Sequence, residues 1–139
     1  MKQLFQNIFR IRSLSRVAVY LSGLFLLLVV LGGQVFRDEK VLQQDIVQYY
    51  SYLPATFIYD DLSMSYARTS PFWQDKIWGY MTPEGAYIPK YTMGLAIMYS
   101  PFFFAGHAQA HLTGAPTHGY SDPYELWLQI GAVVYVFLG

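Results

Sequence analysis

The stretch 17–36, VAVYLSGLFLLLVVLGGQVF, decides the class of this protein because it contains no charged side chain. As an α-helix, these 20 residues rise about 30 Å, which is the thickness of the hydrocarbon layer of a bilayer. We therefore expect a transmembrane helix over residues 17–36.

The residues before the span carry positive charge only. Positions 1–16 contain four basic side chains and no acid: Lys2, Arg10, Arg12 and Arg16. Basic flanks stay on the cytoplasmic side of a membrane, so we expect a cytoplasmic tail at 1–16 and export of the chain after residue 36. A cleaved signal peptide is the alternative, but the end of the run lacks an Ala-x-Ala cleavage site, which favours an uncleaved anchor.

The composition fits a protein that works at a membrane surface. The 139 residues are 54% hydrophobic and 19% aromatic, and only 13% are charged, about half the usual share. Aromatic side chains are favoured at the bilayer interface. The absence of cysteine excludes disulfides and thiolate sites, and a net charge of zero gives no indication of nucleic-acid binding.

Residues 37–123 are expected to form one extracytoplasmic loop domain. Apolar residues recur at helical spacing from Val41 to Tyr59, and Pro54 is expected to kink or break this helix. Residues 60–88 are punctuated by Asp, Ser, Pro and Gly. This pattern predicts irregular structure, with a short hairpin around the sequence TPEGAY.

A second helix is expected in the loop domain, over residues 91–112 and interrupted at Ser100-Pro101. The apolar centre of this segment is about 13 residues long, which is too short to cross a bilayer. That length suits an interfacial or re-entrant helix.

The last segment, 124–139, is expected to be the start of a second transmembrane helix. Ser121 or Asp122 is a candidate N-cap, and Pro123 suits the first helical position. The roughly 14 residues after Glu125 provide about 21 Å of helix, less than a full span. We therefore expect a fragment of a longer all-α membrane protein, a multi-span bundle with an exported helical and irregular loop.

This order of segments resembles the N-terminal part of a GT-C-type membrane glycosyltransferase, near the mannosyl- and aminoarabinosyl-transferases that use lipid-linked sugars. Two motifs carry the resemblance: an acid just past the first span, Asp45, and the later stretch PKYTMGLAIMYSPFF, which contains Lys90. The family's Lys-Pro-Pro-Leu pattern is not kept, because Tyr91-Thr92 replaces the Pro pair. The resemblance implies a protein of the bacterial inner membrane that transfers a sugar from a polyprenyl-phosphate donor at the extracytoplasmic face.

The resemblance also implies roles for single residues. Asp45 is the expected catalytic base for an acceptor hydroxyl, and Lys90 is expected to stabilise the departing phosphate of the donor. Tyr49 and Tyr50 are expected to bind substrate, because their rings offer faces on which a sugar can stack. The simpler interpretations are that Asp45 only favours a helix N-terminus and that Lys90 is an ordinary interfacial lysine.

Other polar residues give weaker signals. Asp60 and Asp61 are most simply part of a helix-ending turn. His107 and His111 are spaced for one helix face, which can place two imidazoles on a metal, and His118 is a candidate third ligand. The Glu of a metalloprotease motif is missing, so we predict no metal site and no cofactor, while a divalent metal is left open.

Two other function classes compete with an enzyme. The chain can instead be a non-enzymatic anchored protein whose aromatic loop binds a partner or lipid, or it can be part of a transporter. For the enzyme, the expected partners are the polyprenyl-phosphate donor and membrane lipid, with no nucleic acid. As a fragment, the 139-residue chain is expected to be inactive alone.

Overall fold

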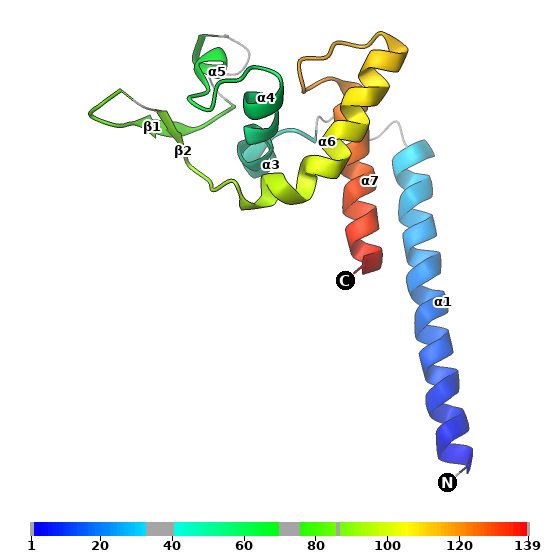
Figure 1. Ribbon diagram of the computed structural model, residues 1–139. Helices are drawn as coiled ribbons and strands as arrows, with labels where there is room; N and C mark the ends of the chain where they lie inside the picture. The colour runs from blue at the N-terminus through cyan, green and yellow to red at the C-terminus, as the bar shows by residue number, and fades with distance from the viewer. Residues whose placement is uncertain (1, 33–40, 70–75, 86, 139) are drawn as a thin grey trace.

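The structure is a computed structural model of the chain, and it describes residues 2–32, 41–69, 76–85 and 87–138. Within residues 2–13 it describes the backbone alone. Most of the described residues are helical, and a two-stranded hairpin supplies the only strands in the described ranges. Figure 1 shows one long helix beside a head that is built from the other elements.

The long helix α1, Lys2–Gly32, includes both the basic tail and the described part of the expected span. Its portion Leu14–Gly32 is long and apolar enough to cross a membrane, which confirms the prediction for this segment in length and composition. Large apolar side chains such as Leu21 and Phe25 are more than 60% exposed there. The tail continues the helix because Lys, Arg, Gln and Leu are good helix formers. Residues 33–36 of the expected span lie outside the described ranges.

The head begins with two short helices, α3 at Gln44–Tyr50 and α4 at Tyr52–Phe57. The expected break in this region is confirmed, but it lies at Ser51 and not at Pro54 itself. Pro54 has no N–H to donate to the carbonyl of Tyr50, so the helical ladder is interrupted one turn before the proline.

A third short helix, α5 at Ser65–Thr69, lies in the region that was expected to be irregular. The carboxylate of Asp61 accepts hydrogen bonds from the backbone N–H groups of Ser65 and Tyr66. These bonds satisfy donors that would otherwise have no partner in the first turn of a helix. The cap therefore explains how so short a helix is held.

The hairpin expected around TPEGAY is confirmed. Strand β1, Gly79–Met81, pairs antiparallel with β2, Tyr87–Pro89. The Gly85 N–H donates to the Thr82 carbonyl at 2.9 Å and closes the turn. Gly85 has a φ of +85°, which glycine adopts without strain.

Helix α6, Gly94–Thr113, runs through Pro101 without a break, so the interruption expected there is wrong. Pro101 cannot donate to the carbonyl of Ile97, and the Ser100 hydroxyl donates to that carbonyl instead, at 2.7 Å. Figure 1 shows the helix changing direction along its length, which an internal proline explains. The helix ends at Gly114, which has a left-handed φ of +70°.

Helix α7, Asp122–Leu138, lies between α6 and α1 and packs against both (Figure 1). Glycine allows both approaches: a Cβ on Gly106 of α6 would lie 2.9 Å from Cα of Tyr124, and one on Gly23 of α1 would lie 1.7 Å from the Phe137 ring. The helix expected over 124–139 is present as far as Leu138, and its role as the start of a second span stays a prediction. Within the described residues α7 has 17 residues, and α1 alone is long and apolar enough to cross a membrane.

Candidate functional site

Asp45 lies in the first turn of α3, and its side chain is exposed. A carboxylate at this position is favoured by the helix dipole. Its Oδ1 atom accepts a hydrogen bond from the Tyr91 hydroxyl at 2.7 Å. The bond connects α3 with the segment that follows β2, so residues distant in the sequence meet at Asp45.

Tyr91 is held in place by two other tyrosines. Its ring lies against the ring of Tyr49, which is one turn after Asp45 on α3, with 4.7 Å between the ring centroids. Its backbone carbonyl accepts a hydrogen bond from the Tyr52 hydroxyl of α4 at 2.8 Å. Contacts with both helices therefore position the phenol of Tyr91 at Asp45.

Lys90 approaches the same phenol. Its Nζ atom lies 5.2 Å from the centroid of the Tyr91 ring and 5.8 Å from that of Trp78, which is cation–π range. The hydrogen bond to Asp45 raises the pKa of Tyr91, and the nearby ammonium of Lys90 opposes this shift. Three of the four expected site residues thus surround one phenol. We call the group the Asp45 cluster: Asp45, Tyr49, Trp78, Lys90 and Tyr91.

Gln48 ties the hairpin to α3, and its side chain is fully buried. Its Nε2 donates to the Lys76 carbonyl at 2.5 Å, and its Oε1 accepts from the Trp78 N–H at 2.9 Å. The Lys90 N–H in turn donates to the Trp78 carbonyl at 2.9 Å. Gln48 therefore helps to fix Lys90 relative to α3. The sequence gives no signal for this role, because glutamine on a helix is ordinarily exposed.

The Asp45 cluster presents a carboxylate, a phenol and an ammonium, and the side chains of Asp45 and Lys90 are exposed. A carboxylate can take a proton from a hydroxyl within hydrogen-bond reach, and an ammonium can stabilise a departing phosphate. The Tyr91 hydroxyl donates a hydrogen bond to Asp45, as the hydroxyl of a bound substrate would. The arrangement is thus capable of base chemistry beside a cation.

Tyr50 lies in the core, apart from this cluster. Its side chain is 0% exposed, and its hydroxyl donates to the Gly119 carbonyl at 2.5 Å. One residue along a helix turns the side chain by about 100°, so Tyr49 and Tyr50 face different surroundings. A side chain sealed from solvent does not fit the expected contact with substrate, and we assign Tyr50 a structural role.

Tyr50 belongs to a group that we call the tyrosine core: Tyr50, Tyr59, Tyr66, Tyr120 and Tyr124. The hydroxyls of Tyr66 and Tyr120 are hydrogen-bonded at 2.8 Å, and the Tyr59 ring stacks on that of Tyr66 at 4.0 Å. Burial raises the pKa of Tyr50, Tyr66 and Tyr120. Three hydroxyls donate to backbone carbonyls of the connector between α6 and α7, at Thr117, His118 and Gly119.

Asp61 has the surroundings of a structural turn residue. Its carboxylate accepts hydrogen bonds from the N–H and hydroxyl groups of Ser63 and Ser65. These bonds, with that of the Ser63 hydroxyl the largest contribution, lower the pKa of Asp61 to about 2. Asp60 beside it is exposed and has a φ of +47°. Both positions fit the interpretation of these acids as part of a turn.

His107 and His111 face each other on α6, with 3.2 Å between their Nε2 atoms. His118 lies in the connector, where its Nδ1 accepts a hydrogen bond from the Tyr120 N–H at 3.2 Å. In the described part of the chain, no three His, Asp or Glu side chains form a group that could hold a metal ion. His118 is therefore not placed as a third ligand.

Comparisons of this chain with protein-family models, with curated proteins and with solved structures found no match. The functional interpretation consequently rests on the geometry of the Asp45 cluster, on its surroundings and on the pattern of the sequence.

Proposed function

We propose that this chain supplies the catalytic base and a donor-phosphate contact of a membrane glycosyltransferase. The enzyme would transfer a sugar from a polyprenyl-phosphate donor to an acceptor at the extracytoplasmic face. The observation that carries the proposal is that Asp45 and Lys90, distant in the sequence, both contact Tyr91. A base beside a cation is what this transfer requires, because a hydroxyl loses a proton while a phosphate departs.

The proposed step uses these residues as follows. The acceptor hydroxyl gives its proton to Asp45 while its oxygen forms a bond to the anomeric carbon of the sugar. The bond between that carbon and the donor phosphate oxygen breaks, and Lys90 stabilises the negative charge on the released phosphate. The Tyr91 hydroxyl gives up its bond to Asp45 when the acceptor binds.

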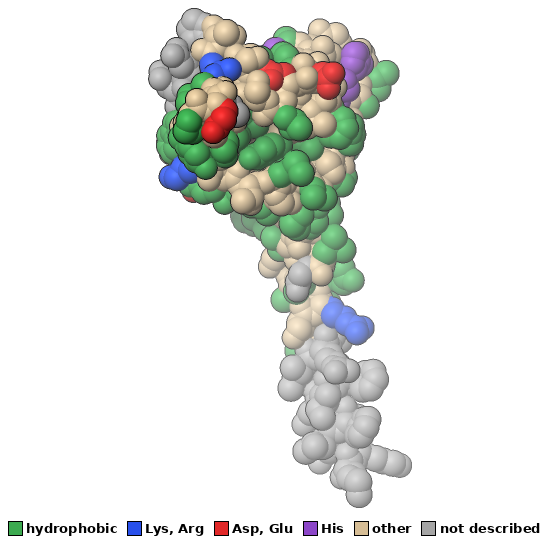
Figure 2. Space-filling view, turned by 60° about the vertical axis from the view of Figure 1, so that its left-hand side comes forward, with side chains coloured by type: hydrophobic (Ala, Val, Ile, Leu, Met, Phe, Trp, Pro, Cys, Tyr) green, Lys and Arg blue, Asp and Glu red, His purple; other side chains and the backbone are tan. Residues whose placement is uncertain are grey.

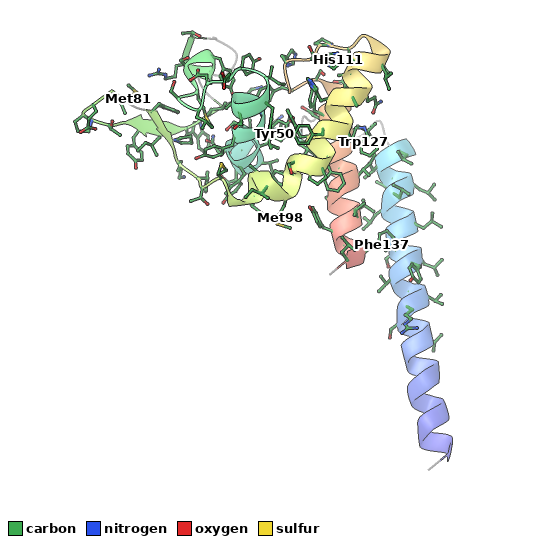
Figure 3. All side chains as sticks on the ribbon, in the orientation of Figure 1. Tyr50, Met81, Met98, His111, Trp127 and Phe137 are labelled. Carbon is green, nitrogen blue, oxygen red and sulfur yellow. The ribbon has the colours of Figure 1, made fainter. Side chains whose placement is uncertain are left out.

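An apolar surface near the Asp45 cluster supports a donor that is linked to lipid. Helix α6 begins shortly after Tyr91, and Leu95, Ile97 and Met98 in its first turns are exposed. Figure 2 shows hydrophobic side chains gathered on the part of the head toward α1, below most of the visible acidic ones. Figure 3 shows Met98 on the lower side of α6. Such a surface favours a polyprenyl tail, because burying apolar area stabilises the complex.

The test measures donor turnover and donor binding in membranes from cells that produce the whole glycosyltransferase to which this chain is proposed to belong. Asp45→Asn keeps the size of the side chain but cannot accept a proton. We expect turnover to fall by about 10²–10⁴-fold, with binding of a short-chain polyprenyl phosphate retained. Lys90→Ala should weaken binding of the polyprenyl phosphate and also slow turnover. The reason is that the ammonium would contact the phosphate both in the bound donor and in the transition state in which the phosphate departs.

Asp60→Asn is the matched control, since Asp60 is also an exposed aspartate but lies outside the Asp45 cluster. This variant should retain turnover and binding. Normal turnover in Asp45→Asn would refute the base, and normal binding of polyprenyl phosphate in Lys90→Ala would refute the phosphate contact.

Docking of an aromatic loop on lipid or on a partner, without catalysis, is a second candidate function. It is favoured by exposed side chains of the hairpin, since Tyr80 is 61% and Met81 51% exposed. Figure 3 shows Met81 at the tip of the hairpin, on the side of the head away from α1. Docking requires Tyr80 and Met81 but not Asp45, so vesicle binding by Tyr80→Ser and Asp45→Asn separates the two functions.

A further inference from the structure

We infer that His107 and His111 form a two-histidine site for a divalent transition-metal ion. Imidazole nitrogen suits Cu²⁺, Ni²⁺ and Zn²⁺, with Cu²⁺ bound most tightly by a given set of ligands. The site lies toward the C-terminal end of α6, where Figure 3 labels His111, and Met98 lies near the other end of the helix. The inference is independent of the proposed transferase function.

The distance between the two histidines fits one shared ion. Their Nε2 atoms are 3.2 Å apart. A tetrahedral ion with metal–nitrogen bonds of about 2.0–2.1 Å holds two nitrogen ligands about 3.3 Å apart. Both nitrogens can therefore reach a single ion with very little movement of the rings.

The hydrogen bonds behind His107 set its tautomer for metal binding. The Tyr124 hydroxyl has one hydrogen, which it donates to the Thr117 carbonyl at 3.2 Å. Its oxygen therefore accepts the hydrogen bond from Nδ1–H of His107, at 2.5 Å. A neutral imidazole that carries its proton on Nδ1 presents a lone pair at Nε2. Metal-ligating histidines are commonly held by such a partner on the other ring nitrogen.

One ligand of the pair is fixed and the other is accessible. The His107 ring stacks on that of Phe103, with an interplanar angle of 12°, and Tyr124 behind it is 0% exposed. His111 is exposed. Since no third His, Asp or Glu joins the pair in the described ranges, water would complete the coordination of the ion.

Copper binding to the detergent-solubilised protein, purified without a polyhistidine tag, tests the site. We expect one Cu²⁺ per chain at saturation, with the electron paramagnetic resonance spectrum of two imidazole nitrogens. Loss of a partner that only supports a ligand weakens metal binding about 10–100-fold, so loss of the ligand itself in His111→Asn should weaken binding at least as much and leave the signal of one nitrogen. His118→Asn is the matched control and should bind as the unchanged protein does. Circular dichroism checks that both variants keep their helix content.

A second variant tests the tautomer. Tyr124→Phe keeps the ring but removes the hydroxyl that accepts from His107, and the loss of such a partner typically weakens metal binding about 10–100-fold. Failure to see saturable copper binding, or equal losses in His111→Asn and His118→Asn, would overturn the site. Unchanged affinity in Tyr124→Phe would overturn the role given to that hydroxyl.

Discussion

The Asp45 cluster and the tyrosine core start from neighbouring residues of one helix but differ in what their hydroxyls bind. Tyr50 donates to a backbone carbonyl of the connector between α6 and α7, and its side chain is sealed from solvent. Next to it, Tyr49 packs on Tyr91, whose hydroxyl donates to the exposed carboxylate of Asp45.

This difference indicates which tyrosines are able to change partner. A buried hydroxyl that loses its hydrogen-bond partner lowers stability by about 1–3 kcal/mol. The buried hydroxyls of the tyrosine core are therefore expected to keep their hydrogen bonds to the connector. At the surface, water or a ligand can replace a lost partner. Tyr91 can therefore release Asp45, whereas Tyr50 cannot release Gly119 without loss of stability.

The largest predicted effect is loss of an aromatic ring from the buried region. Phe103 is 0% exposed, and its ring lies 5.9 Å from that of Tyr50 and 5.6 Å from that of Tyr124. Phe103→Ala should lower the free energy of unfolding by about 3–5 kcal/mol. Tyr49→Ala in the Asp45 cluster should cost much less, about 1 kcal/mol. Unfolding followed by circular dichroism in detergent measures both, and equal losses would contradict the comparison.

A smaller effect is predicted when only a hydroxyl is removed. The Tyr66 hydroxyl is hydrogen-bonded to that of Tyr120 at 2.8 Å and donates to the Ser51 carbonyl at 3.3 Å. Tyr66→Phe should therefore cost about 1–2 kcal/mol. Tyr91→Phe removes a surface bond and should change stability by less than about 0.5 kcal/mol. Chemical denaturation of the two variants sharpens the comparison, and a larger loss in Tyr91→Phe would reverse it.

Among the losses predicted around the tyrosine core, the smallest is that of the Asp61 carboxylate, which caps α5 next to Tyr66 and responds to acid. The pKa of Asp61 is about 2 in the folded protein, whereas an aspartate side chain without these hydrogen bonds has a pKa of 3.8. Its stabilising effect is thus fully present above about pH 4 and is lost as the pH falls toward about 2. Asp61→Ala should lower stability by about 1 kcal/mol or less at neutral pH and flatten this acid dependence.

Melting temperatures between pH 5 and pH 2 provide the measurement for Asp61, with Asp60→Ala as the control of the same residue type. If Asp61→Ala kept the full acid dependence of the unchanged protein, the cap on α5 would not be its source.

Local patterns in the sequence predicted several elements of the fold. The uncharged run in α1, the hairpin turn and the break near Pro54 each depend on a few neighbouring residues. The continuity of α6 through Pro101 was not predicted, because the Ser100 hydroxyl replaces the missing backbone donor. The short helix α5 was missed because its cap comes from an aspartate that was interpreted as the end of an earlier helix.

For the candidate site, the sequence identified most of the polar groups but not what joins them. Asp45, Tyr49 and Lys90 were candidates, whereas Tyr91 was noted only as a departure from the family's Pro pair. Helical spacing already placed Tyr50, and not Tyr49, on the apolar stripe with Val47 and Leu53. All three are buried, so this pattern was a better guide to Tyr50 than the expected contact with substrate. Gln48 was missed because its role depends on the position of the hairpin.

The tyrosine core also determines how the protein responds to alkali. Burial holds the pKa of Tyr50 and Tyr120 well above 10, while a phenol in the unfolded chain ionises near pH 10. Because the folded state keeps protons that the unfolded chain loses, stability is retained below that pH and decreases as the pH rises beyond it. Tyrosinate absorbance from these phenols should therefore appear together with the release of the connector, so that the ultraviolet spectrum reports unfolding of the head.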